Sequence, residues 1–247
     1  MTEEQIINIF GSGLVFEAIE LAEKNDFTDL SEKFKKSIEH ISDPCAYYDH
    51  YKQNNGRIPG AQIETGGGPD SRQQTAMNHL KAIGATSLLD IGCADGSFCF
   101  FCLKEGIVKN TIGIDPWEEG IDWATEYSLR MDLNAHFIQG IFEDVKVGEY
   151  NFDAIHLGEI LEHVIDPVVI LRSLRKYHPK GIVITVPTER PPVTEEEKKI
   201  LTDGRIAEHV RLITPELLLT FCKNSGFEII SSDIIGSGWV NLIATIV

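Results

Sequence analysis

The sequence predicts an α/β protein whose core is a doubly wound, mostly parallel β-sheet. Beyond the first third of the chain, short apolar runs alternate with amphipathic stretches, as expected for strands that alternate with helices. The first of these runs ends at Asp90 and is followed by Gly92 and Gly96, a pattern typical of a strand, a tight turn and a helix start. The chain closes with two apolar runs, 227–234 and 239–247, whose short glycine-rich connection suits antiparallel neighbours.

Each element of the sheet domain can be placed in order from its apolar pattern. Strands are predicted at Ser87–Ile91, Thr111–Asp115, Ala135–Gln139, Phe152–Leu157 and Gly181–Val186. Helices are predicted at Ser97–Glu105, Trp117–Met131, Val168–Tyr177 and, after the capping residue Thr214, Pro215–Asn224. In a sheet of this kind, ligands bind at the carboxyl ends of the parallel strands.

An N-terminal extension precedes this domain. Residues 1 to about 45 have apolar positions spaced by three and four and interrupted by two glycines, which predicts helices, one of them at Leu30–Ile41. Their apolar faces need a partner, so we interpret the extension as a cap on the main domain, or as a lid or a homodimer face. The chain is therefore divided into an extension, residues 1–70, and a main domain, residues 71–247.

The end of the extension is a long stretch rich in glycine and proline, residues 43–70, which carries Tyr47, Tyr48 and Tyr51. A loop of this length in a compact protein is either functional or a linker. Because tyrosine rings and hydroxyls can close over a ligand, the three tyrosines are candidate substrate-binding residues, the alternative being a linker with tyrosines packed on the surface. Asp70 then caps the helix that opens the main domain.

Composition excludes several classes of protein. The 247 residues are 43% hydrophobic and 24% charged, as in ordinary globular chains. No apolar run reaches the roughly 18 residues of a membrane helix, and the acidic N-terminus lacks the features of a secretory signal. We therefore expect a cytoplasmic protein with no membrane partner. The net charge of −16 repels phosphate backbones, so a nucleic-acid partner is not expected either.

The glycine turn suits a small polar ligand that has both donor and acceptor groups. Gly92 and Gly96 let a ligand approach bare backbone, and the helix that follows presents N–H groups. Asp115, at the end of the second strand, is placed to accept hydrogen bonds from two ribose hydroxyls. A pyrophosphate site uses G-x-G-x-x-G, whereas this turn holds Ala94 and Asp95, whose carboxylate opposes a phosphate. The sequence contains no P-loop motif.

Three motifs in order resemble those of the class I S-adenosylmethionine-dependent methyltransferases. They are Leu89-Asp90-Ile91-Gly92-Cys93-Ala94-Asp95-Gly96, Gly113-Ile114-Asp115-Pro116, and the run from Phe152 through Glu159-Ile160-Leu161-Glu162-His163-Val164 to Asp166-Pro167. More narrowly, the chain is similar to the ubiquinone-biosynthesis O-methyltransferases and other small-molecule O-methyltransferases. The resemblance covers about residues 71–247. It implies a Rossmann-like fold with a seven-stranded sheet whose last strand is antiparallel, S-adenosyl-L-methionine as the cofactor, and S-adenosyl-L-homocysteine as the product.

The resemblance also implies cofactor contacts at the matching positions. Gly92, Ala94 and Gly96 would line the turn beneath the methionine part of the cofactor. Asp90 would orient this turn, or would approach the ammonium group through a water molecule.

The adenosine part would lie over the second and third strands. Asp115 would bind the ribose hydroxyls, and Pro116 and Trp117 follow it, with Trp117 either stacked on the adenine or packed in the core. After the third strand the sequence departs from the family, in which an acid often recognises the adenine amino group. Backbone groups of Ile141 and Phe142 are the candidates for that role here.

Candidate catalytic residues follow the fourth strand. Methyl transfer from a sulfonium is an in-line displacement that needs the acceptor and the methyl group close together and aligned. A hydroxyl acceptor must also lose its proton to a base or near a metal. Glu159, Glu162 and His163 share one face of a helical turn, and His209 lies in a loop at the same end of the sheet.

Three interpretations of this group remain open. In the first, His163 or His209 is a general base. In the second, these two histidines bind a divalent metal together with Glu159 and Glu162, as in the small-RNA 3′-end methyltransferases, whose E-x-x-E-H motif this run resembles. In the third, Glu159 touches the cofactor or the substrate and His163 is structural. We assign no metal, because the same motif occurs widely in relatives that are not expected to need one.

The sequence therefore predicts a cytoplasmic S-adenosylmethionine-dependent methyltransferase that acts on a hydroxyl of a small molecule, such as a sugar, a quinone precursor or another metabolite. One alternative is a metal-dependent RNA 3′-end ribose 2′-O-methyltransferase, which the net charge of −16 opposes. Another is a non-catalytic relative that binds the cofactor, and the intact glycine turn argues against it.

Overall fold

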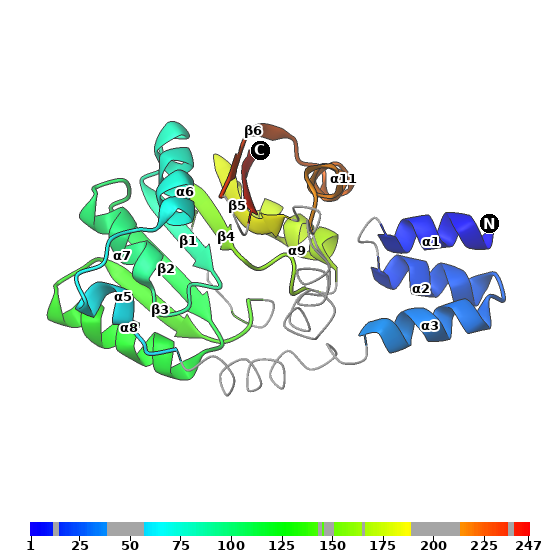
Figure 1. The fold of residues 1–247 in the computed structure, drawn as a ribbon, viewed down its shortest axis with the longest axis horizontal. Coiled ribbons are helices and arrows are strands. Elements are labelled where there is room, and N and C mark those ends of the chain that lie inside the picture. The colour runs from blue at the N-terminus through cyan, green and yellow to red at the C-terminus, as the bar shows by residue number, and fades with distance from the viewer. Residues whose placement is uncertain are drawn as a thin grey trace.

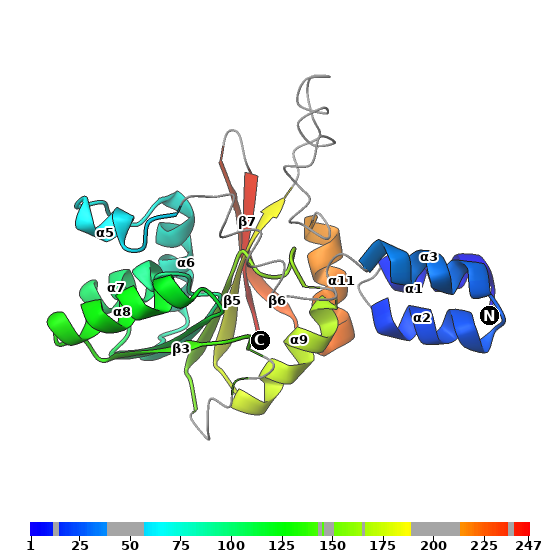
Figure 2. The ribbon, with the colours of Figure 1, turned by 90° about the horizontal axis from the view of Figure 1, so that it is seen from below.

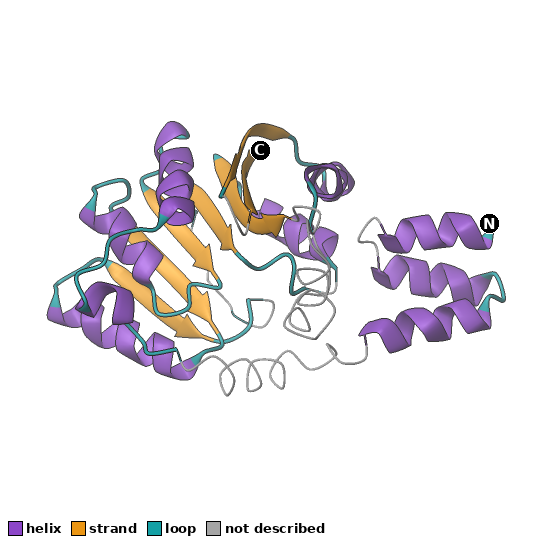
Figure 3. Ribbon diagram, viewed as in Figure 1, coloured by secondary structure: helices purple, strands orange, loops and turns teal. Residues whose placement is uncertain are grey.

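The fold is described from a computed structural model of the chain over residues 1–11, 15–38, 57–142, 145, 151–164, 166–188, 213–236 and 240–247. A seven-stranded sheet lies at its centre and carries helices on both faces, and three further helices stand to one side (Figure 1). Figure 3 shows the strands gathered in one layer with the helices outside it. The predicted α/β class is confirmed.

The strands of the sheet are β1 (Ser87–Ile91), β2 (Asn110–Asp115), β3 (Ala135–Gln139), β4 (Ala154–Gly158), β5 (Gly181–Thr188), β6 (Ile229–Ile235) and β7 (Val240–Ile246). Their order is β3-β2-β1-β4-β5-β7-β6. The first five strands are parallel, and β7 pairs antiparallel with both β5 and β6. The strand order reverses between β1 and β4, and ligands of doubly wound sheets bind in the crevice at such a point.

The helices of this domain form two layers. α6 (Ser71–Ala82), α7 (Ser97–Lys104) and α8 (Glu118–Arg130) lie on one side of the sheet, and α9 (Pro167–Leu174) and α11 (Pro215–Ser225) lie on the other (Figure 2). Successive side chains of β1 enter opposite layers: Leu88 packs in a cluster with Met77 and Phe101, and Leu89 packs in a cluster with Ile155 and Leu171. The strand is therefore buried on both faces, as expected for a central parallel strand.

The N-terminal extension contains α1 (Glu3–Gly11), α2 (Val15–Lys24) and α3 (Thr28–Ile38). These three helices pack on one another through a cluster of their own that includes Ile6, Ala18 and Phe34. The predicted first helical stretch is two helices, since α1 ends at Gly11, and glycine is a poor helix former. None of the helices in the described part of the chain has the length and apolar character that a membrane crossing requires.

The predicted strands agree with the observed strands to within two residues at each end. The prediction for Val168–Tyr177 differs in detail, because α9 ends at Leu174 and a 3₁₀ turn, η2 (Arg175–Tyr177), follows. One element was not predicted. The short helix α5 (Ala61–Glu64) lies in the stretch expected to be a loop, and four residues are too few to give a helical period.

Candidate functional site

The turn between β1 and α7 has a left-handed backbone at three positions. The φ angles of Gly92, Ala94 and Gly96 are +75°, +50° and +72°. A Cβ atom at Gly92 would lie 2.1 Å from Cδ1 of Ile160, so glycine is needed here for space as well as for conformation. The backbone N–H of Gly92 donates to the carbonyl oxygen of Ile114 at 2.8 Å, which fixes the turn beside β2.

Asp95 fastens the segment that contains α5 onto this turn. Its Oδ2 accepts a hydrogen bond from the backbone N–H of Gly60 at 2.8 Å. Its Oδ1 accepts from the backbone N–H and the hydroxyl of Ser97, at 3.2 and 2.7 Å. The carboxylate of Asp95 therefore occupies the N-terminus of α7, where a nucleotide-binding fold would place a phosphate. The site is built for a ligand without a pyrophosphate group.

Asp115 links the turn to the loop before α8. One carboxylate oxygen accepts from the backbone N–H of Ala94 and the other from that of Trp117, each at 2.8 Å. The residue is only 2% exposed. Asp115 is thus a structural clamp between the turn and the loop before α8, and it is also the predicted ribose-binding residue.

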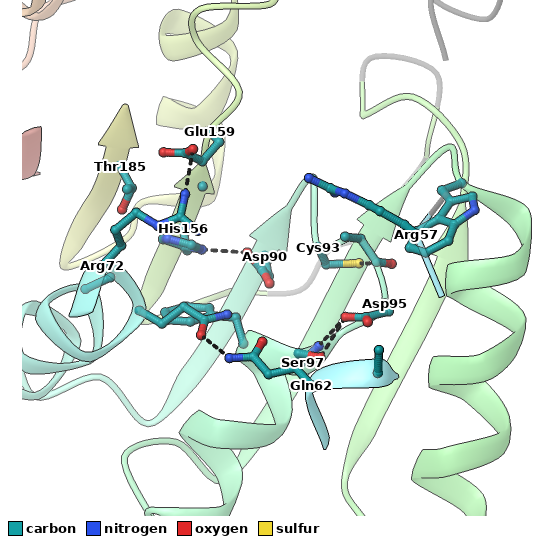
Figure 4. Close-up of a pocket in the computed structure, with 18 of the residues that line it drawn as sticks. Arg57, Gln62, Arg72, Asp90, Cys93, Asp95, Ser97, His156, Glu159 and Thr185 are labelled. Carbon is teal, nitrogen blue, oxygen red and sulfur yellow. Dashed lines mark hydrogen bonds and ion pairs between the residues drawn. The ribbon is translucent and has the colours of Figure 1, made fainter. Parts of the chain in front are cut away.

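A cavity of about 410 Å³ lies above the turn (Figure 4). Its walls come from the segment before α6, the first residues of α6, the glycine turn, Trp117, and the ends of β4 and β5. A volume of this order is typical of small-molecule and cofactor sites. The cavity lies at the carboxyl ends of β1 and β4, where the strand order reverses.

The predicted site residues divide into three groups. Those that line the cavity are Asp90, Gly92, Ala94, Trp117 and Glu159. Those that are described but lie outside its lining are Gly96, Asp115, Pro116, Ile141, Phe142 and His163. Phe142 packs in the main hydrophobic core. Tyr47, Tyr48, Tyr51 and His209 lie outside the described residues.

A pair of charged residues closes the β4 end of the cavity. Arg72, in the first turn of α6, donates from Nη1 to Oε2 of Glu159 at 2.8 Å and from Nη2 to Oδ2 of Asp70 at 2.9 Å. Glu159 follows β4 with a φ of +59°, a strained conformation for a residue with a side chain. Its Oε1 is buried and has no hydrogen-bond partner in the part of the chain that the structure describes. Burial raises the pKa of Glu159, although the neighbouring Arg72 opposes this effect.

Glu162 is fully buried, and no described residue is hydrogen-bonded to either of its carboxylate oxygens. Burial, reinforced by the charge of Glu159, raises the pKa of Glu162 well above its usual range. Nε2 of His163 lies 3.8 Å from Oε1 of Glu162. Within the described residues, no three His, Cys, Asp or Glu side chains are grouped as a metal site requires.

The cavity residues that were not predicted from the sequence include Arg72, His156 and Thr185. Arg72 gave no signal, because its approach to Glu159 depends on how α6 packs beside β4. His156 did give a signal: it is a polar residue within an apolar strand, and buried polar groups are more informative than buried apolar ones. Its Nδ1 lies 2.7 Å from Oδ1 of Asp90.

A model of the methyltransferase domain family matches residues 57–232, well over half of the chain. The chain belongs to the class I S-adenosylmethionine-dependent methyltransferases. The match begins at Arg57, so it includes the segment that Asp95 fastens to the glycine turn. The predicted family, fold and enzyme class are confirmed.

Two curated relatives are similar to this methyltransferase at low identity. The ubiquinone biosynthesis O-methyltransferase of Haemophilus ducreyi is 26% identical over 155 residues, which cover 57% of this chain and 64% of the relative. The tRNA U34 carboxymethyltransferase of Alteromonas mediterranea is 24% identical over 211 residues, which cover 81% of this chain and 61% of the relative. The methyltransferase therefore spans less than two thirds of the length of either relative.

Solved structures agree on the fold. A SAM-dependent methyltransferase from Aquifex aeolicus aligns with a TM-score of 0.54 at 16% identity, over 77% of this chain and all of that one. The small RNA methyltransferase HEN1 aligns with a TM-score of 0.60 at 20% identity, over 71% of this chain and 24% of that one. At these identities the likeness concerns the fold alone.

The cofactor implied by the family is S-adenosylmethionine, and the residues present fit it. The left-handed turn at Gly92, the carboxylate of Asp95 at the start of α7 and the cationic Arg72 suit a ligand with an amino-acid end and no phosphate. The carboxylate of Asp115, at the end of β2, is the kind of group that accepts hydrogen bonds from ribose hydroxyls.

Proposed function

We propose that this methyltransferase transfers a methyl group to the oxygen of a hydroxyl on a small molecule, such as a sugar, a quinone precursor or another metabolite. The proposal depends mainly on the position and conformation of Glu159. This residue lines the cavity, its backbone is held in a left-handed conformation, and its Oε1 is buried without a partner among the described residues. Strained backbone of this kind persists mainly at functional sites.

In this proposal Glu159 handles the proton of the acceptor. The hydroxyl oxygen attacks the methyl carbon in line with the departing sulfur, and the hydroxyl proton must leave as the new bond forms. Oε1 of Glu159 accepts that proton, while Arg72 holds Oε2 in place. Because burial raises the pKa of Glu159, this carboxylate is a stronger base than an exposed one. His163 and His209 remain predicted catalytic residues, with His163 placed beside Glu162.

The remaining cofactor roles are proposals as well. Gly92 and Ala94 would lie beneath the methionine part, Asp115 would bind the ribose hydroxyls and Trp117 would cover the adenine. Arg72, whose guanidinium lines the cavity, would pair with the cofactor carboxylate. When bound, S-adenosylmethionine supplies the activated methyl group, and the side chains of the chain bind it, orient it and exclude water.

Two observations support a small acceptor: the net charge of the chain, and the name of a relative. A net charge of −16 disfavours a polyanion such as RNA at any site without a basic patch. The name of the Haemophilus ducreyi relative refers to O-methylation in ubiquinone biosynthesis.

A second candidate is a metal-dependent ribose 2′-O-methyltransferase acting on RNA 3′ ends, and Glu162 favours it. A buried carboxylate with two unpartnered oxygens costs free energy unless something compensates its charge. Nε2 of His163 lies 3.8 Å from Oε1 of Glu162, and a divalent cation there would still need a further donor beyond the described residues, for which His209 is the candidate of the sequence. Such a cation would stabilise the ionised acceptor oxygen.

The experiment that separates the two candidates is methyl transfer from S-adenosylmethionine labelled in its methyl group. The acceptors would be a low-molecular-mass metabolite fraction and a small-RNA fraction, each assayed with and without a chelator. The proposal expects label in the metabolite fraction, and expects Glu159→Gln to lose turnover while it still binds S-adenosylhomocysteine.

The matched control is Glu126→Gln, because Glu126 is exposed on α8. Label found only in RNA, and abolished by chelation, would favour the second candidate. Full turnover by Glu159→Gln would contradict the proposed base.

A further inference from the structure

His156 and Asp90 form a buried pair beneath the cavity. They are register partners on the neighbouring parallel strands β4 and β1, so their side chains emerge side by side on one face of the sheet. Nδ1 of His156 lies 2.7 Å from Oδ1 of Asp90, and the two residues are 6% and 1% exposed. Since an ionised carboxylate only accepts hydrogen bonds, Nδ1–H is the donor and Nε2 is left as an acceptor in the neutral ring.

The imidazole ring is fixed in this orientation. The ring of Phe98 packs against it with 4.1 Å between the centroids. Gly158 provides the space on another side, since a Cβ atom there would lie 2.6 Å from Cε1 of His156. Asp90 is held in turn by the thiol of Cys99, which donates to Oδ2 at 3.3 Å. A ring held by three neighbours presents Nε2 in one direction.

Among the residues that the structure describes, Nε2 of His156 has no hydrogen-bond partner, and neither has the buried hydroxyl of Thr185 on β5. Both residues line the cavity. Figure 4 shows His156, Thr185, Arg72 and Glu159 gathered at one end of the site, with Asp95 at the other. Leaving buried polar atoms unpaired is costly, so their presence at one end of a cavity indicates a polar ligand there.

The strand order indicates which part of the cofactor reaches this end. Asp115 and Trp117, the candidate adenosine contacts, follow β2, and the sheet continues from β2 through β1 to β4 and β5. A cofactor whose ribose lies near β2 and whose thioether crosses the glycine turn therefore brings its amino-acid end to β4 and β5. That end carries an ammonium group, which donates, and a carboxylate, which accepts.

We propose that His156, oriented by Asp90, is a cofactor-binding residue whose Nε2 accepts a hydrogen bond from the α-ammonium group of S-adenosylmethionine. The hydroxyl of Thr185 donates to the neighbouring carboxylate. The inference rests on the cofactor of the family and not on the identity of the methyl acceptor. In this proposal the buried Asp90 is a positioning residue. Its carboxylate keeps the proton of the ring on Nδ1 of His156, so that the lone pair of Nε2 points towards the ligand.

The test compares three ligands with different amino-acid ends, and for each ligand it takes the ratio of its affinity for a variant to its affinity for the unmodified chain, so that differences at sulfur cancel. S-adenosylhomocysteine carries both groups, decarboxylated S-adenosylmethionine keeps the ammonium group, and 5′-methylthioadenosine lacks both. In His156→Asn the amide N–H can still donate to Asp90, but no atom reaches the position of Nε2. In His156→Phe the ring packing on Phe98 is kept, but both nitrogens are lost. Thr185→Val removes a hydroxyl to which no described residue is hydrogen-bonded, and it keeps the shape of the side chain.

Isothermal titration should show that both His156 variants bind S-adenosylhomocysteine and decarboxylated S-adenosylmethionine about tenfold or more weakly, with affinity for 5′-methylthioadenosine unchanged. Thr185→Val should weaken S-adenosylhomocysteine about two- to tenfold and leave the decarboxylated ligand unaffected. The control is His136→Asn, at an exposed position on β3, and thermal unfolding without ligand checks the fold.

Two results would overturn the proposal. If the His156 variants bind S-adenosylhomocysteine as the unmodified chain does, Nε2 has no role in cofactor binding, even if turnover falls. If they lose affinity for all three ligands equally, the ring acts through the fold of the site. Failure of the unmodified chain to bind S-adenosylhomocysteine would refute the family cofactor itself, an outcome that the titration distinguishes from both.

Discussion

Replacing Asp115 with asparagine should weaken both the fold and the cofactor site, and the structure gives the size of the first effect. The carboxylate accepts two backbone hydrogen bonds in a buried position. An asparagine amide can accept only one of them, so one N–H faces another donor. A hydrogen bond to a charged group contributes about 1.5–3 kcal/mol, and the free energy of unfolding should fall by about that amount. Alanine would lose both bonds, a large fraction of the roughly 5–15 kcal/mol that stabilises a typical domain.

The effect of Asp115→Asn on cofactor binding is measured by titration with S-adenosylhomocysteine under conditions in which the variant remains folded. If the same carboxylate binds the ribose hydroxyls, affinity should fall more than about tenfold, or ~1.4 kcal/mol. Asp122→Asn is the control, because Asp122 is exposed on α8. Unchanged affinity with reduced stability would refute the ribose assignment. Unchanged stability would refute the view of Asp115 as a clamp between the turn and α8.

Three other perturbations probe the site. Glu162→Gln, studied in a chelator, should stabilise the fold at neutral pH, because burial raises the pKa of this carboxyl well above its ordinary value of 4.5. The folded state disfavours the charged form of Glu162, so the gain in the free energy of unfolding should be absent below pH 4.5 and should grow as the pH rises. Urea unfolding at several pH values measures this gain. A gain that does not depend on pH would contradict this reasoning. Gly92→Ala should lower the free energy of unfolding by about 1–2 kcal/mol for the left-handed backbone alone, and it should displace the side chain of Ile160. Thermal unfolding should therefore show reduced stability, and cofactor titration should show reduced affinity. Asp95→Ala should cost about 1.5–3 kcal/mol through the lost hydrogen bonds from Ser97 to the charged carboxylate. It should also release Gly60, which faster amide exchange at Gly60 would detect; unchanged exchange would show that Asp95 does not hold the segment.

The fold was predictable because its elements carry strong local signals. The parallel strands are short and apolar on both faces, and turns or caps such as Gly84, Asp70 and Thr214 mark the ends of the helices between them. The capping box at Asp70 illustrates this, since its side chain accepts from the backbone of Gln73 and the Gln73 side chain accepts from Asp70. Such patterns involve residues that are close in sequence, so they can be recognised from one sequence alone.

The site was predictable only in part, because its remaining contacts join residues far apart in sequence. Arg72 meets Glu159 across 87 positions, and His156 meets Asp90 across 66. No local pattern encodes these pairs; they arise from the register of β1 with β4 and from the packing of α6. The motif around Glu159 identified the family, but it did not show that Oε1 of Glu159 would be buried without a partner.

The most direct test of the account is the fate of the methyl group. The purified chain would be incubated with S-adenosylmethionine carrying a carbon-13 methyl group and with a metabolite fraction, and the products would be examined by NMR and mass spectrometry. The account predicts a new methyl group bonded to oxygen in a small molecule, formed by the unmodified chain and lost in Glu159→Gln. A methyl group found on nitrogen, sulfur or carbon, or label found solely in RNA, would contradict it.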